Sequence, residues 1–159
     1  PAKMEAALVR NAKLREEGTK NLVSASTKAN VQKMIAQSIA FVYEPGVLPH
    51  TEESPLLNFD EPTYGMTSRA IASLEQQVLS APFTGIVLRN GLLYGPDTGF
   101  DAPVDFVPAV HVDAAAHAAF LAINGDASVI YNVSDDDKRL STAKIKSALG
   151  WSLSYRMHA

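Results

Sequence analysis

The chain has 159 residues, of which 47% are hydrophobic, and a chain of this size buries roughly 68–70% of its unfolded surface, so we expect residues 1–159 to form one unit. The formal charge of -3 and the scattered basic residues do not favour nucleic acid as a partner, and the absence of cysteine excludes disulfides and thiolate metal sites. Because no apolar run approaches the ~20 residues of a membrane span and the first residues lack the apolar core of a signal peptide, we expect a cytoplasmic protein without a membrane partner.

The first half of the chain predicts a long helix, a strand and a loop. Apolar residues recur at helical spacing from Met4 to about Asn30. Gly18 lies inside this helix, where a tolerated glycine usually has a packing reason. The segment 33–43, KMIAQSIAFVY, is rich in β-branched and aromatic residues and predicts a strand. Residues 44–63 carry four prolines and no periodicity, which predicts a long loop of the kind that often serves function.

The middle of the chain predicts a helix from Ser68 to Leu79 and then a strand within Thr84 to Pro96, TGIVLRNGLLYGP. Ile86 to Leu88 form a continuous apolar run, which is typical of a strand covered on both faces. Residues 95–108 predict another loop.

The last third predicts an alanine-rich helix over 113–123 with Asp113 as its N-cap, a strand over 128–134, and a helix from Ser141 to Leu149 that stops at Gly150. Helices and strands thus alternate along the chain. This order predicts an α/β fold with about three parallel strands, flanking helices and right-handed crossovers.

Six segments follow one another along the chain: GTKNLVSAS, QSIAFVYEPG, LRNGLLYGP, VHVDAAAHAA, IYNVSDDD and LGW. In this order they resemble a divergent branch of the NAD-dependent epimerase/dehydratase family, the extended short-chain dehydrogenase/reductases. The resemblance implies the C-terminal half of a Rossmann-like doubly wound fold, because the chain contains no G-x-G-x-x-G turn for the cofactor pyrophosphate. It also implies NAD or NADP in the complete protein, and we expect this chain alone to bind neither.

The resemblance has a consequence for partners. By analogy the strand from Lys33 to Tyr43 would have a further strand beside it in a complete family member, and here it would be an exposed apolar edge. Such an edge is a template for pairing with another chain. We therefore expect a homo-oligomer, or docking to a separate N-terminal half, in addition to a small-molecule substrate.

The family's mechanism, as the resemblance implies, uses a Ser or Thr after a strand and a Tyr-x-x-x-Lys pair in which the lysine lowers the tyrosine pKa. Ser38 and Tyr64 are the candidate catalytic residues on this basis. An alignment on Tyr43, however, places the Ser/Thr position at Ile39, and one position along a strand means the opposite face. Four residues after Tyr64 stands Ser68 rather than a lysine.

A second register, aligned on Leu74-Glu75, places the tyrosine and lysine positions at Thr67 and Ile71. Neither register supplies a lysine, so the acid/base machinery of the family is eroded. Tyr64 is open to interpretation as a loop aromatic, and Ser38 as an ordinary serine at a strand end.

A cofactor-binding set is predicted where the buried strand ends, because open α/β sheets bind ligands beyond the carboxyl ends of their strands. This set is Asn90, Gly91, Tyr94, Gly95 and Pro96. The alternative is a tight turn between strand and loop. His111, Asp113 and His117 have spacings that suggest metal ligands, but the N-cap role already explains Asp113 and catalytic zinc usually needs three protein ligands, so we expect no metal site.

These patterns favour a fragment of an NAD(P)-dependent epimerase/dehydratase-like oxidoreductase that forms the substrate side of the cofactor cleft. Its substrate would be a sugar or a small hydroxy or keto compound. Two alternatives stay open: a relative that binds a dinucleotide without turnover, and an oligomeric interaction fragment without enzyme activity.

Overall fold

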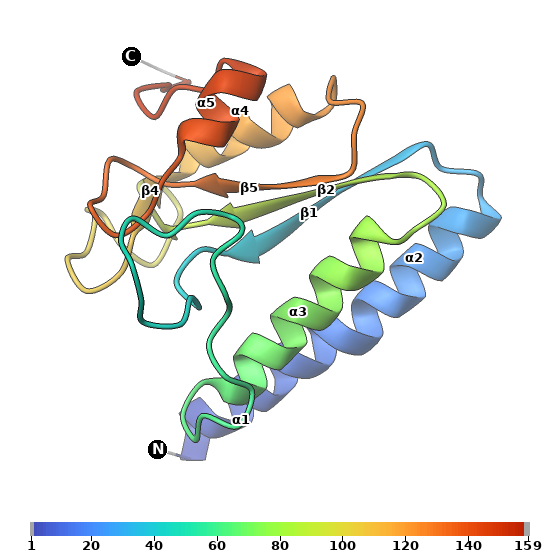
Figure 1. The fold of residues 1–159 in the computed structure, drawn as a ribbon, viewed down its shortest axis with the longest axis horizontal. Coiled ribbons are helices and arrows are strands. Elements are labelled where there is room, and N and C mark those ends of the chain that lie inside the picture. The colour runs from blue at the N-terminus through green and yellow to red at the C-terminus, as the bar shows by residue number, and fades with distance from the viewer. Residues whose placement is uncertain (1, 158–159) are drawn as a thin grey trace.

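The computed structural model describes residues 2–157 and places helices on both faces of a small parallel sheet (Figure 1). Its helical elements are α1 (Ala2–Lys13), the π-helical turn η1 (Leu14–Gly18), α2 (Thr19–Lys28), α3 (Gly65–Leu79), α4 (Val112–Ala122) and α5 (Ala143–Leu149). Its strands are β1 (Lys33–Ile39), β2 (Thr84–Asn90), β3 (Leu92–Tyr94), β4 (Ala109–His111) and β5 (Val129–Val133). No helix in the described part of the chain has the length and apolar content needed to cross a membrane.

The central sheet has three parallel strands in the order β1-β2-β5. Six of the seven residues of β2 are buried, because both neighbours pair with it and helices cover both of its faces. In the register of the sheet Ile86 lies between Ile35 of β1 and Val129 of β5. The predicted α/β fold with about three parallel strands is thus confirmed, and the carboxyl ends of the strands meet at one edge of the sheet.

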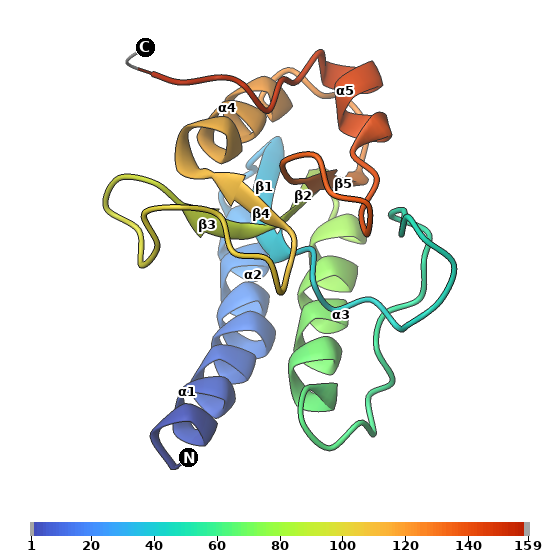
Figure 2. The same ribbon diagram turned by 90° about the vertical axis from the view of Figure 1, so that its left-hand side faces the viewer.

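Alternate residues of β2 point into two separate cores, as the pleat of a strand requires. Ile86 and Leu88 join a cluster with the helices α4 and α5, whereas Val87 packs against α3. Trp151 closes the first cluster, and its indole N–H donates a hydrogen bond of 2.8 Å to the carbonyl of Ala114. Helices α1 and α2 run alongside α3 on the other face, as Figure 2 shows.

The long N-terminal helix is continuous to Lys28, but one turn of it, Leu14–Gly18, is a π-helix. The expected packing reason for Gly18 is wrong, because an added Cβ would meet nothing within 4 Å. The close approach occurs instead at Gly85, where a Cβ would lie 2.1 Å from the carbonyl oxygen of Val78. A residue with a side chain at the start of β2 would therefore collide with the end of α3.

The predicted strand 33–43 ends at Ile39, four residues early. The chain then leaves the sheet and pairs with the long loop: the Leu57 N–H donates to the Val42 carbonyl and the Glu44 N–H to the Pro55 carbonyl. These bonds satisfy backbone groups that a longer β1 would have used. Helix α3 begins at Gly65, three residues before the predicted start.

Two short strands are not separate elements of the sequence prediction: β3 lies inside the segment Thr84 to Pro96, which predicts one strand, and β4 follows the predicted loop 95–108. β3 and β4 pair in parallel, with Leu92 opposite Ala109, and β4 runs directly into α4. The cap of α4 is therefore His111, whose Nδ1 accepts a hydrogen bond from the Asp113 N–H at 3.2 Å. The prediction of Asp113 as the N-cap is wrong by two residues.

The last helix begins at Ala143, so Ser141 is not its N-cap. The cap residue Thr142 makes no side-chain cap bond, and the Ser141 hydroxyl accepts only a long bond of 3.4 Å from the Ala143 N–H. Gly150 ends the helix in the left-handed region with φ of 64°, as the sequence predicts.

Candidate functional site

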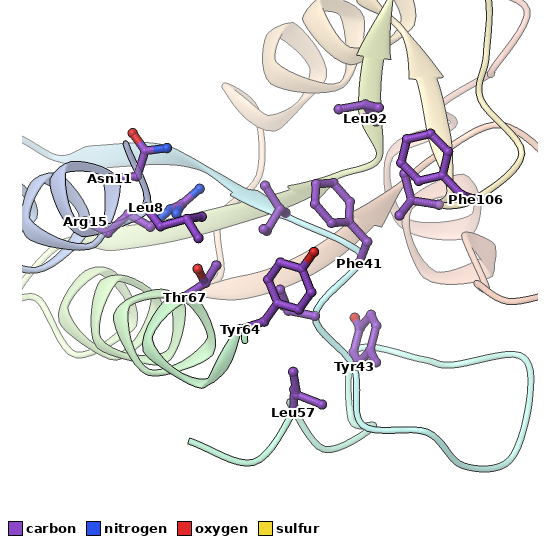
Figure 3. A pocket seen from close by; sticks show the side chains of 13 residues that line it. Leu8, Asn11, Arg15, Phe41, Tyr43, Leu57, Tyr64, Thr67, Leu92 and Phe106 are labelled. Atoms are coloured by element: carbon purple, nitrogen blue, oxygen red, sulfur yellow. The ribbon is translucent and has the colours of Figure 1, made fainter. Parts of the chain in front are cut away.

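A pocket of about 430 Å³ lies at the carboxyl end of β1 (Figure 3). It is bounded by the first helices, by the segment that follows β1 and by the start of α3. Most of its wall is apolar or aromatic, and its lining residues are Leu8, Asn11, Arg15, Ile39, Phe41, Val42, Tyr43, Leu57, Tyr64, Thr67, Leu92, Phe106 and Val107. No acidic residue is among them. Open α/β sheets place their ligands at this edge.

Tyr64 lies in this pocket at the start of α3. It is the N-cap residue of the helix, and its side chain is 53% exposed. Its backbone N–H donates to the Glu61 carboxylate, which holds the chain at the helix start. Thr67, one turn further, is buried and also lines the pocket, and Ile71 is fully buried below it. The structure thus brings both candidate tyrosine positions, Tyr64 and Thr67, to one pocket without a lysine in its lining.

The structure does not bring Ser38 to this pocket. The Ser38 side chain points to the face that α3 covers, is 2% exposed, and donates a hydrogen bond of 2.9 Å to Glu75 Oε1. Ile39 lines the pocket in its place. The separation follows from the alternation of side chains along a strand, and it leaves Ser38 outside the pocket that Ile39 and Tyr64 line.

Ser38 belongs instead to a buried polar network, in which Arg89 and Glu75 form a bidentate ion pair. The Nε–Oε1 distance is 2.8 Å and the Nη2–Oε2 distance is 2.7 Å. The side chains of Arg89 and Glu75 are 4% and 5% exposed. Burial lowers the pKa of Arg89, but Glu75 and Tyr43 outweigh this effect and raise it overall. Arg89 therefore stays protonated inside the protein.

The network continues to the pocket wall through Tyr43. Arg89 Nη1 donates to the Tyr43 hydroxyl at 2.8 Å, and that hydroxyl donates to Asn132 Oδ1 at 2.6 Å. The Asn132 backbone N–H in turn donates to the Glu52 carboxylate at 2.8 Å. The Tyr43 ring stacks on His50 at 5.0 Å. Burial raises the pKa of Tyr43 although Arg89 opposes the shift, so Tyr43 is a fixed, neutral part of the wall.

Sequence reasoning missed this network, although a signal for it exists. Glu75 occupies a position in α3 between the buried Leu74 and Val78, and Arg89 lies inside the buried strand β2. Two opposite charges at positions that periodicity assigns to the core predict a buried pair.

The predicted cofactor-binding residues lie between the last residue of β2 and the turn after β3, and none of them lines this pocket. Gly91 and Gly95 have internal reasons to be glycine: a Cβ at Gly91 would lie 2.8 Å from the Pro108 oxygen, and one at Gly95, where φ is 109°, would lie 2.7 Å from His111 Nε2. Pro96 is exposed in the following turn.

The Tyr94 hydroxyl donates a hydrogen bond of 2.7 Å to Asp135 Oδ2, and burial together with Asp135 raises its pKa. Asn90 differs from the other predicted residues. Its side chain is 5% exposed, and its amide oxygen has no hydrogen-bond partner within the described residues. Buried polar atoms are nearly always satisfied, so this oxygen is an acceptor that a ligand could use.

The three residues considered as metal ligands have other contacts. The ring of His111 meets Tyr94 edge to face at 5.2 Å, and His117 stacks on Tyr155 at 3.9 Å. The Asp113 carboxylate accepts a hydrogen bond from the Met157 N–H. Over residues 2–157 the structure contains no group of three or more His, Asp or Glu side chains arranged to hold a metal ion.

No profile of a known protein family matches the chain. Among curated proteins, a 3-diazoavenalumate denitrifying reductase from Streptomyces sp is 35% identical over 151 residues, which cover 82% of this chain and 50% of the reductase. The chain therefore spans about half the length of the curated relative that it matches.

Solved structures extend the comparison to the fold. The dTDP-glucose 4,6-dehydratase DesIV from Streptomyces venezuelae, with NAD and TYD bound, has a TM-score of 0.77 and 16% identity over 98% of this chain and 66% of its own. The UDP-glucose 4-epimerase of Thermotoga maritima has a TM-score of 0.71 and 18% identity over 91% and 65%. This chain has the NAD-dependent epimerase/dehydratase fold. A third structure with this fold, RMD from Pseudomonas aeruginosa complexed with NADPH, has a TM-score of 0.75 and 17% identity over 94% and 71%.

The residues of this epimerase/dehydratase fold fit a nicotinamide cofactor in part. The unpaired Asn90 oxygen suits the N–H group of a nicotinamide carboxamide. The sequence contains no glycine-rich turn for a pyrophosphate. The chain therefore offers one acceptor for the reactive end of the cofactor and no glycine-rich turn for its phosphates.

Proposed function

We propose that this chain forms the substrate side of an NAD(P)-dependent reductase. The observation that carries the proposal is the pocket at the carboxyl end of β1, where the half-exposed Tyr64 faces an apolar wall. The curated relative is a reductase by name, and two of the structures with the same fold were solved with NAD or NADPH. A sugar would need many hydrogen bonds from the wall, and this wall supplies few. An aromatic substrate matches it better than the sugar that the family resemblance implies.

The direction of the proposed reaction is taken from the curated relative, which is a reductase by name. Reduction needs a hydrogen-bond or proton donor, and the phenol of Tyr64 is one. When bound, the reduced cofactor supplies a hydride. Asn90 would hold its carboxamide, and Tyr64 would donate to the group that is reduced.

The proposal requires a further segment that supplies the phosphate-binding turn. Among the described strands, β1 is the edge strand of the sheet and has a neighbour on one side only, so its other side can pair with a further strand. In this proposal a strand of an N-terminal half covers that side, on the same polypeptide or on a separate one. The chain alone would then bind no dinucleotide, and a calorimetric titration with millimolar NADPH should give no heat of binding.

Oxidation of NADH and NADPH by the complete protein, with small aromatic acceptors, tests the function. Tyr64→Phe should lower kcat by about tenfold or more with little change in KM, because loss of a general acid typically costs roughly 10²–10⁴ in rate. Tyr155→Phe, which removes a phenol near His117 instead, should leave kcat unchanged.

Two other results have clear meanings. An unchanged kcat in Tyr64→Phe would remove Tyr64 from the proposed role. Dinucleotide binding without any turnover would favour the alternative, a relative that binds a dinucleotide but does not catalyse a reaction. The second alignment register agrees with that alternative, because Thr67 and Ile71 then occupy the tyrosine and lysine positions and neither is an acid or a base.

A further inference from the structure

Arg15 is the only charged residue in the lining of the pocket, counted over the described residues. It lies in the π-helical turn η1, and its side chain reaches the pocket beside Leu8 and Asn11, as Figure 3 shows. Burial lowers the pKa of its guanidinium, and no carboxylate in the described part of the chain offsets this effect. A cation that is partly removed from water without a counter-charge costs free energy. A ligand carboxylate would recover it through two parallel charge-assisted hydrogen bonds.

The rest of the wall is suited to a ring. Phe41 and Phe106 line the pocket together with Tyr64. The side chains of Phe106 and Tyr64 are 71% and 53% exposed, so a ligand ring could bury apolar surface on both. Aromatic rings in offset or edge-to-face geometry attract each other in addition to the gain from burying their surface. The volume of about 430 Å³ lies in the range of small-molecule sites.

We infer that the pocket binds an aromatic carboxylate, with the carboxylate on Arg15 and the ring against Phe41, Tyr64 and Phe106. The inference rests on the proposed function only in taking this pocket as the substrate site. It adds that the substrate is an aromatic acid and that Arg15 determines specificity without touching the group that is reduced. A carboxylate fits better than a phosphate, because one planar guanidinium in an apolar wall matches a singly charged planar group.

Isothermal titration of this chain with 4-hydroxycinnamate, and with its neutral amide as a matched probe, tests the inference. We expect the acid to bind at least tenfold more tightly than the amide, since a hydrogen bond to a charged group is worth about 1.5–3 kcal/mol, or roughly 10–100-fold in affinity. Hexanoate, which keeps the charge and lacks the ring, should also bind at least tenfold more weakly than the acid.

Variants assign the effect to Arg15. Arg15→Gln should remove the preference for the acid and leave the affinity for the amide within about twofold of the wild type. Arg15→Lys should keep part of the preference, because lysine has the charge but not the planar guanidinium that donates two parallel hydrogen bonds. Arg10→Gln removes an exposed arginine from α1 and should change nothing. Thermal unfolding of each variant checks that it is folded.

The inference is overturned if the acid and the amide bind equally, if Arg15→Gln keeps the preference, or if the folded chain binds none of the probes at millimolar concentration. The titration needs no cofactor and no turnover. Acid binding without NADPH oxidation would therefore refute the reductase and leave the aromatic-acid site standing. Oxidation of NADPH without a preference for acids would do the reverse.

Discussion

The ion pair of Arg89 with Glu75 joins three elements at the end of the sheet that carries the pocket. Arg89 comes from β2, Glu75 from α3, and Ser38 of β1 shares the same carboxylate. Both charges are nearly free of water contact, so each depends on the other for compensation. Tyr43 is held by the same guanidinium, and the position of one pocket wall therefore depends on this pair.

Removal of one partner should be more harmful than removal of both. We expect Glu75→Leu or Arg89→Met to lower the free energy of unfolding by about 3–5 kcal/mol, because either change leaves an uncompensated buried charge. The double variant with both substitutions should recover part of this loss, since apolar residues of similar volume can replace a buried pair. Urea unfolding of the three variants provides the measurement.

A matched control is the exposed pair of Lys13 and Glu17, whose charged atoms are 3.7 Å apart and whose side chains are 69% and 66% exposed. Glu17→Gln should change stability by about 0.5 kcal/mol or less, because solvent-exposed pairs are screened by water. A double variant as unstable as the worse single one would show that Arg89 and Glu75 do not compensate each other.

For single residues, the sequence predicts which face of a strand or helix a side chain lies on better than it predicts which other side chains it contacts. Ser38 and the pocket position Ile39 lie on opposite faces of β1, as the two-residue period of a strand predicts. The pairing of Glu75 with Arg89 joins residues 14 positions apart, and Arg15 reaches a pocket whose other walls come from distant segments. Periodicity marks Glu75 and Arg89 as buried charges, but no local pattern shows which side chains meet around Arg15, because the tertiary fold creates that pocket.

At the scale of elements, the long helices and the buried strand were predictable because their patterns extend over several turns or over a continuous apolar run. The short strands β3 and β4 were not, since a strand of three residues carries almost no pattern and exists only through its pairing. The same limit explains the misplaced caps. His111 caps α4 because β4 ends there, which is a tertiary fact.

Two glycines test how closely the elements pack. We expect Gly18→Ala to raise the free energy of unfolding by about 0.5–1 kcal/mol, because Gly18 has helical dihedral angles and open space around an added Cβ. Gly85→Ala should lower it by about 1–3 kcal/mol, because the new Cβ would collide with the carbonyl of Val78 and push α3 from β2. Thermal or urea unfolding separates the two. Equal effects at both positions would contradict the packing described here.

At the scale of the whole molecule, the carboxyl edge of the sheet collects the pocket, Asn90 and the loops that follow β1 and β2. The order β1-β2-β5 leaves β1 with a partner on one side only among the described strands. The fold class follows from alternation in the sequence, whereas the chemistry of the pocket follows from which side chains the fold gathers. For this reason the family resemblance predicted the fold and left the substrate as a sugar or a small hydroxy or keto compound, whereas the aromatic ligand proposed above follows from the apolar wall of the pocket.

The open side of β1 leads to the last prediction. If no further strand covers this side, the chain should self-associate through the edge, and light scattering coupled to size exclusion should give a mass that rises above 17.1 kDa with concentration. Gln37→Lys places a charge at an exposed position of β1 and should weaken the association, because a lysine on an edge strand opposes strand addition. Gln76→Lys adds the same charge at an exposed position of α3 and should leave it unchanged. A wild-type chain that stays monomeric at high concentration would show that β1 does not act as a pairing edge, and the proposed need for a covering strand would lose its support.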